Sequence, residues 1–155
     1  MTISEKINYK IALQKKCIAI LEERIHSIRF AMQEAQAAAN SEEKSSAGDK
    51  YETSRAMNHL EKDMQASRLL ASLKDLENLM LVDCNTVCDK VQKGSFVRCD
   101  KASYFIAAGL GKALFKNKKV FLVSPDAPIA VTLSGKQAGH TCEFNNDQLT
   151  IKEVF

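Results

Sequence analysis

The sequence predicts an α+β protein in which an N-terminal antiparallel coiled-coil hairpin of helices precedes a small β-rich domain. Three observations lead to this fold class. Residues 1–47 contain no glycine or proline and carry apolar residues at helical spacing. A polar segment with the first glycine of the chain then interrupts that pattern. After residue 83 the helical period gives way to short strand-like segments. We therefore expect one domain over 1–83 and a second over 84–155.

The first predicted helix is defined by an apolar seam. Its members recur at steps of three and four residues, the spacing of a face that packs against a partner helix. They are Ile7, Ile11, Ile18, Leu21, Ile25, Ile28, Met32, Ala35 and Ala39. Gln14 occupies the one position of this spacing that is not apolar.

A turn is predicted at residues 40–50, where the segment NSEEKSSAGDK is polar. Helical spacing then resumes, so a second helix is expected from about Lys50 to about Val82. Its apolar positions are Met57, Leu60, Met64, Leu69, Leu73, Leu76 and Met80. Two helices joined by a short polar turn form an antiparallel hairpin, and its tip spans residues 41–52.

The second half predicts a small, mostly antiparallel sheet. Strand character is found at residues 94–99, 104–108, 120–123, 140–144 and 148–154. Turns are expected at residues 109–111, 116–119 and 145–147. Residues 129–133 follow a bend between two prolines and are compatible with a short helix or a turn.

Composition and charge exclude several classes of protein. No stretch approaches the roughly 20 apolar residues of a membrane span, and the N-terminus lacks the apolar run of a secretory signal. We therefore expect a cytoplasmic protein with no membrane partner. Residues 1–84 carry 12 basic and 13 acidic residues, whereas residues 85–155 carry 10 and 6. The basic second half suits an acidic protein or nucleic acid, and equally an ordinary domain that happens to be basic.

The five cysteines predict reduced thiols, because their number is odd and no export signal is present. Cys84 and Cys88 lack the second close pair that a zinc site normally has. We interpret the cysteines as buried thiols that fill small gaps. No cofactor of the protein's own is expected.

Three segments resemble the Gre-type transcription elongation factors (GreA/GreB-like). At the predicted tip, residues 48–52 read GDKYE, which is similar to the family's G-D-x-x-E arrangement. Residues 127–130 read APIA and are followed by Leu133 and Gly135-Lys136, similar to the family's S-P-I-A/G…L…G-K segment. Residues 149–155, LTIKEVF, resemble its final strand. The resemblance depends on the order of these motifs along a hairpin and a β domain.

The resemblance implies an FKBP-like second domain and a factor that binds bacterial RNA polymerase through its secondary channel. Asp49 and Glu52 would then help to hold a Mg²⁺ ion at the polymerase active centre and stimulate cleavage of backtracked transcripts. The protein would be an accessory factor and not an enzyme, since the active centre belongs to the polymerase, with which it would share the Mg²⁺ ion. It is expected to be a monomer. It would meet nascent RNA and DNA only within the elongation complex. Residues expected to contact these partners are Arg55, Arg68, Lys116, Lys118, Lys119, Pro128 and Ile129.

Alternatives remain open at the tip. Asp49, directly after Gly48, suits the N-cap of the second helix, with Glu52 completing a capping box. Lys50 and Thr53 depart from the family pattern, which favours a non-catalytic regulator in the same channel. A coiled-coil adaptor or holdase is a further alternative from another class. It predicts exposed apolar residues at the tip, whereas residues 40–52 are almost wholly polar.

Overall fold

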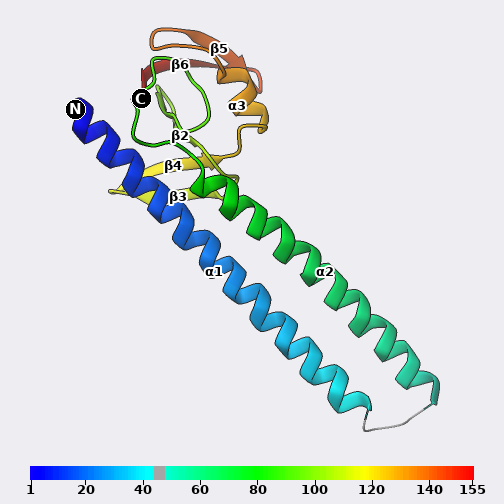
Figure 1. Ribbon diagram of the computed structural model, residues 1–155. Coiled ribbons are helices and arrows are strands. Elements are labelled where there is room, and N and C mark those ends of the chain that lie inside the picture. The colour runs from blue at the N-terminus through cyan, green and yellow to red at the C-terminus, as the bar shows by residue number, and fades with distance from the viewer. Residues whose placement is uncertain (44–47) are drawn as a thin grey trace. The chain divides into compact units, whose positions relative to one another are not determined.

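The structure, a computed structural model, describes the backbone of residues 1–43 and 48–155 and the side chains of residues 1–41 and 52–155. Two long helices, α1 (Ile3–Glu43) and α2 (Gly48–Met80), precede a six-stranded sheet and one short helix, α3 (Pro128–Leu133) (Figure 1). The predicted α+β class is therefore confirmed. The chain divides into two compact units: Leu21–Leu76, here the helical unit, and Met1–Ile20 with Glu77–Phe155, here the sheet unit.

The helical unit contains residues 21–43 of α1 and 48–76 of α2, which pack together as antiparallel neighbours (Figure 1). None of the members of the apolar seam predicted for α1 is exposed, and Leu21 and Ile25 are buried as expected. Before Leu21, however, the buried positions of α1 are Lys10, Leu13 and Cys17, which the predicted seam does not include. Ile25 is buried, while Ile28, Met32, Ala35 and Ala39 are half-buried. Between the helices, the Lys62 ammonium group donates a hydrogen bond to Oε1 of Gln36 (3.2 Å).

The apolar seam predicted for α2 is wrong, because a different face of the helix is covered. Met57, Leu60 and Met64 are 66%, 62% and 54% exposed. Leu73 and Met80 are exposed as well, and of the predicted seam only Leu69 and Leu76 are half-buried. The covered face of α2 recurs at heptad spacing, and its two buried members within the helical unit, Gln65 and Ser72, are polar. The face also includes Leu69 and Leu76, which are half-buried, and continues to Leu79 in the sheet unit.

The reason for this phase lies at the base of the helices, in the sheet unit. Leu79 near the end of α2 is fully buried. The side-chain amide of Gln14 donates hydrogen bonds to the carbonyl oxygens of Leu79 (2.9 Å) and Val82 (3.0 Å). A continuous helix has one phase, so anchoring Leu79 turns Ser72 and Gln65, one and two heptads earlier, to the covered side. Gln14 thus supplies donors to a carbonyl near the end of α2 and to one just after it, and the Leu79 oxygen also accepts the Val82 N–H (3.2 Å).

Lys10, one turn before Gln14, is fully buried. Its ammonium group donates a hydrogen bond of 2.6 Å to the carbonyl oxygen of Thr86. The loop after α2 is closed locally by Asp83, whose carboxylate accepts hydrogen bonds from the Asn85 amide (2.8 Å) and the Thr86 hydroxyl (3.1 Å). The base of α1 therefore holds the chain from residue 79 to residue 86 through polar contacts.

The sheet contains six strands in the order β3-β4-β2-β1-β6-β5. Their bounds are β1 (Phe96–Cys99), β2 (Ser103–Ile106), β3 (Gly111–Phe115), β4 (Lys118–Val123), β5 (Thr141–Phe144) and β6 (Asp147–Val154). Neighbouring strands are antiparallel except for the parallel pair β2 and β4. The mostly antiparallel sheet and all five predicted strands are thus confirmed.

Strand β3 is the element that the sequence does not predict. We expect turns at residues 109–111 and 116–119, but the chain is extended from Gly111 to Phe115. Only Lys116 and Asn117 form the second turn, with positive φ angles of 47° and 62°. Two successive positive φ values match a type I′ hairpin turn. Lys118 and Lys119 already belong to β4.

The core of the sheet unit includes residues of α1, α3 and the sheet. The Tyr9 ring of α1 meets the rings of Phe96 and Phe115 edge-on, each with a centroid separation of 5.0 Å. Residues 129–133 form a helix, which decides between the two predicted alternatives. The buried side chains of α3 pack with those of β1, β2 and β6.

The helices extend further into the predicted turn than expected. Helix α1 continues to Glu43 and α2 begins at Gly48, so much of the segment 40–50 is helical. Serine and glutamate cost at most about 0.7 kcal/mol each in a helix relative to alanine, too little to end it. Residues 44–47 lie outside the described part of the chain.

Replacing the donor at the base should destabilise the protein. We expect Gln14→Ala to lower the free energy of unfolding by about 1–3 kcal/mol, because the Val82 carbonyl oxygen loses its side-chain donor and the Leu79 carbonyl oxygen keeps only the bond from the Val82 N–H (3.2 Å). Urea denaturation followed by circular dichroism measures this change. Gln36→Ala is the matched control, since Gln36 is exposed, and its effect should stay within about 0.5 kcal/mol. Equal losses in both variants would contradict the role assigned to Gln14.

Filling the polar face of α2 should stabilise the protein. Ser72→Leu places an apolar side chain at a covered heptad position, which should raise the free energy of unfolding by about 1–2 kcal/mol. The control is Ser67→Leu at an exposed position of the same helix. Thermal unfolding of both variants compares them, and a higher midpoint for Ser67→Leu would show that the inferred phase is incorrect.

Candidate functional site

The tip residues identified by the resemblance lie in the first turns of α2. The helix begins at Gly48, so Asp49 is its second residue and Glu52 its fifth. Asp49 thus lies inside the helix, one residue or more beyond the N-cap position considered from the sequence. Glu52 is exposed, whereas the side chain of Asp49 lies outside the described side chains. Carboxylates at this end of a helix are favoured by its dipole.

The following turns of α2 expose a cation and an apolar stripe. Arg55 is exposed close to the tip. Met57, Leu60 and Met64, here the apolar stripe, follow at steps of three and four residues and therefore share one face of the helix. This surface could not be predicted from the sequence, because the same spacing predicts a buried seam.

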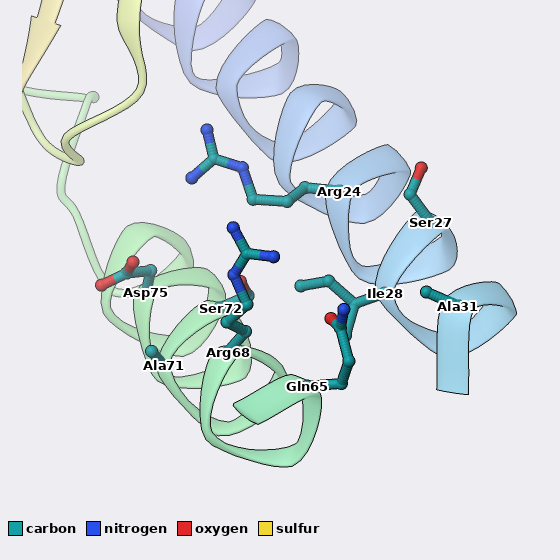
Figure 2. A pocket seen from close by; sticks show the side chains of 9 residues that line it. All are labelled: Arg24, Ser27, Ile28, Ala31, Gln65, Arg68, Ala71, Ser72 and Asp75. Carbon is teal, nitrogen blue, oxygen red and sulfur yellow. The ribbon is translucent and has the colours of Figure 1, made fainter. Parts of the chain in front are cut away.

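A groove of about 480 Å³ lies between α1 and α2 within the helical unit (Figure 2). Its wall on α1 consists of Arg24, Ser27, Ile28 and Ala31. Its wall on α2 consists of Gln65, Arg68, Ala71, Ser72 and Asp75. The small side chains of both walls leave this space open.

Two arginines extend into this groove from opposite walls (Figure 2). In the part of the chain that the structure describes, neither Arg24 nor Arg68 forms an ion pair, although Asp75 lines the same groove. Guanidinium groups bind carboxylates and phosphates through two parallel hydrogen bonds. The groove is therefore suited to anionic groups. Arg68 is a candidate contact from the sequence alone. Arg24 is not, because it comes to line the same groove only when the two helices pack with this face of α2 covered.

The predicted lysine contacts lie together on the hairpin of β3 and β4, in the sheet unit. Lys116 occupies the turn, and Lys118 and Lys119 begin β4; all three are exposed. The Lys116 ammonium group lies 5.2 Å from the centroid of the Tyr9 ring, within cation–π range. The lysines and the tip carboxylates belong to different compact units.

The other two predicted contact residues begin α3. Pro128 is exposed at the first position of the helix, where its missing N–H is not needed. Ile129 is only 7% exposed and packs in the core with Leu133. Pro128 thus has a surface available to a partner, whereas Ile129 contributes to the fold.

The cysteines are free thiols, in agreement with the sequence. Burial raises the pKa of the Cys17 thiol to about 12, and the neighbouring Cys84 adds to this effect. Burial likewise raises the pKa of Cys99 to about 11. Thiols of this kind are poor nucleophiles at neutral pH because the thiolate is scarce. Among the described side chains, no group of three His, Cys, Asp or Glu residues is placed to hold a metal ion.

No family model, curated protein or solved structure matches this chain. We therefore infer its function from its own residues and geometry. Within residues 1–43 and 48–155, no helix has the length and apolar character needed to cross a membrane.

Stability should fall at alkaline pH through the buried thiol of Cys17. Its pKa is about 12 in the folded protein and near 9.0 when unperturbed, so the folded state retains a proton that the unfolded state loses. Stability from this group is complete below pH 9 and declines as pH rises towards 12. Urea denaturation at several pH values should show a shallower decline for Cys17→Ala than for the wild type. Parallel declines would contradict this assignment, and Cys142→Ala serves as the control.

Proposed function

We propose that this chain is an accessory factor of a bacterial-type RNA polymerase. In this proposal the helical unit enters the secondary channel, and the tip carboxylates stimulate cleavage of backtracked transcripts. The observation that supports it most is the position of Asp49 and Glu52 in the first turns of α2, at the end of the hairpin where the helices connect. The order of a helical hairpin followed by a sheet also agrees with the Gre-type resemblance.

The dimensions of the helical unit suit insertion into a channel. Residues 21–43 and 48–76 form helical arms of about 35 and 44 Å at a rise of 1.5 Å per residue. Two helices side by side are only about 20–24 Å wide. A narrow rod of this kind can carry a few side chains into a deep and confined active centre.

The chemistry of the tip suits a role in metal-assisted hydrolysis. A second Mg²⁺ ion, when bound, activates water and offsets the negative charge that develops during phosphodiester cleavage. Carboxylate oxygens are the protein ligands that Mg²⁺ prefers, and one or two of them suffice because the ion keeps several waters. Glu52 is exposed and therefore accessible to an ion that the polymerase holds. Arg55, three residues further, presents a cation suited to a phosphate of the transcript.

We further propose that the sheet unit is FKBP-like and docks on the polymerase. Its mixed six-stranded sheet with α3 packed in the core is compatible with this assignment. The exposed lysines of the β3–β4 hairpin and the exposed Pro128 offer contacts to an acidic polymerase surface. A non-catalytic regulator would use the same docking, and Lys50 beside the carboxylates favours that version because a cation there opposes Mg²⁺ binding.

A second function is favoured by the apolar stripe. Met57, Leu60 and Met64 are exposed within a few turns of the tip, and exposed apolar residues are what a coiled-coil adaptor or holdase requires. The polar residues 40–52 argue against a client-binding tip, but the stripe provides an apolar surface directly beyond it. This adaptor function is our alternative to the polymerase proposal.

Transcript cleavage by purified, backtracked bacterial RNA polymerase with Mg²⁺ tests the proposal. We expect the wild-type factor to accelerate cleavage and Asp49→Ala/Glu52→Ala to reduce the acceleration about 10- to 100-fold, as for the loss of metal-orienting groups. The matched control is Glu22→Ala/Glu23→Ala, which removes two exposed carboxylates elsewhere on the helical unit.

The three possible failures of this experiment have different meanings. Equal losses in the tip variant and the control would exclude a specific role of the tip carboxylates. Absence of cleavage, with retained competition against a known channel binder, would indicate the non-catalytic regulator. Absence of both activities would reject the polymerase proposal and leave the adaptor as the better function.

A further inference from the structure

We propose that the free edge of β3 is a docking site for an extended acidic segment of a partner protein, which adds to the sheet as a seventh strand. Strand β3 (Gly111–Phe115) ends the sheet, and among the residues that the structure describes it pairs with β4 alone. A free strand edge presents backbone donors and acceptors that another extended chain can pair with. This inference concerns the sheet unit alone and does not depend on the function proposed for the helical unit.

The hairpin geometry identifies which backbone groups are free. The turn has two residues, Lys116 and Asn117, and pairs Phe115 with Lys118. Residues that flank such a turn exchange both backbone hydrogen bonds, and the direction of these bonds alternates along a strand. The N–H and C=O groups of Phe115 and Ala113 therefore point to β4. Those of Lys112 and Leu114 point outward and are available to a partner strand.

The edge carries uncompensated positive charge. Residues 109–125 contain four lysines and no acidic residue. Within the described side chains, none of Lys112, Lys116, Lys118 and Lys119 forms an ion pair. Two of the ammonium groups are placed over aromatic rings, Lys112 over Phe121 at 5.4 Å and Lys116 over Tyr9 at 5.2 Å. These cations are thus oriented by the protein while their positive charge remains available.

The side chains of β3 specify the sequence of the occupant. Lys112 and Leu114 are exposed on one face, and Leu114 is 60% exposed. Residues opposite them in a partner strand lie two positions apart on the same face. We therefore infer a partner with an acidic residue and an apolar residue at positions i and i+2. A second copy of β3 is a poor occupant of this edge, because it would bring a second hairpin with the same uncompensated positive charge against the first.

The probe is a synthetic peptide in which glutamate and valine alternate on one face, separated by threonine. Added to the full-length, ¹⁵N-labelled protein at low salt, it should shift the amide resonances of Lys112, Leu114 and their neighbours. Binding should weaken as salt is added, because the lysines are exposed. A peptide with lysine in place of glutamate is the ligand control and should not bind.

Three variants separate backbone pairing from charge. Leu114→Pro removes an outward N–H at an edge position where proline is tolerated, and should weaken binding about tenfold. Leu114→Thr keeps the donor and should bind more tightly than the proline variant. Lys112→Glu/Lys119→Glu should abolish binding, whereas Lys90→Glu/Lys93→Glu changes the net charge equally at exposed positions outside the edge and should retain it.

Four results would overturn the proposal. The first is the absence of shifts at Lys112 and Leu114 in the wild-type protein. The second is equal affinity for the glutamate and lysine peptides. The third is preferential binding of a single-stranded RNA oligonucleotide to the same lysines. The fourth is concentration-dependent self-association through this edge, seen by analytical ultracentrifugation. Transcript cleavage is measured separately, so failure here leaves the function of the tip unaffected.

Discussion

Lys10 and Gln14 of α1 donate hydrogen bonds to backbone carbonyl oxygens at the end of α2 and in the loop behind it. The last carbonyls of a helix have no partner within it, and a buried carbonyl without a donor costs about 1–3 kcal/mol. Leu79 and Val82, whose carbonyl oxygens receive two of these hydrogen bonds, are both buried. The end of α2 is thereby fixed at one rotation about its axis, and much of the surface of the helical unit follows from that rotation.

The groove and the apolar stripe have this common origin. With Leu79 buried, Ser72 and Gln65 lie on the covered side of α2, where their short or polar side chains leave room beside Arg24 and Arg68. The same rotation turns the apolar stripe, Met57, Leu60 and Met64, to the surface. A two-helix hairpin that exposes methionine and leucine while covering serine and glutamine gives up apolar burial, which is the main source of helix pairing energy.

Much of the fold could be predicted from the sequence, because periodicity and turn residues act locally. The α1 seam, five strands and the short helix at 129–133 all follow from such signals. The phase of α2 could not be predicted, since Leu79 and Met80 are both apolar and the contacts that accompany the burial of Leu79 involve residues far away in the sequence, such as Gln14. Strand β3 was missed because glycine, lysine and alanine in an edge strand give no alternating pattern.

Some residues of the candidate sites are close together in the sequence, whereas others are brought together only by folding. Asp49, Glu52 and Arg55 are close in the sequence, so their common position at the start of α2 follows directly from the helix prediction. Arg24 and Arg68 are far apart along the chain, and only the packing of two helices brings them to one groove. Ile129 belongs to a segment similar to a family motif, yet its burial assigns it to the core.

The polar face of α2 also has a consequence for native-state dynamics. Resistance to local opening comes mainly from buried apolar contacts, and within the helical unit α2 contributes chiefly the half-buried Leu69 and Leu76 to the covered face. The sheet unit, by contrast, buries most of the core side chains. Amide protons of residues 21–76 should therefore exchange with solvent through partial opening, while those of the central strands exchange only on global unfolding. The hairpin can then change its helix separation on its own timescale without loss of the sheet.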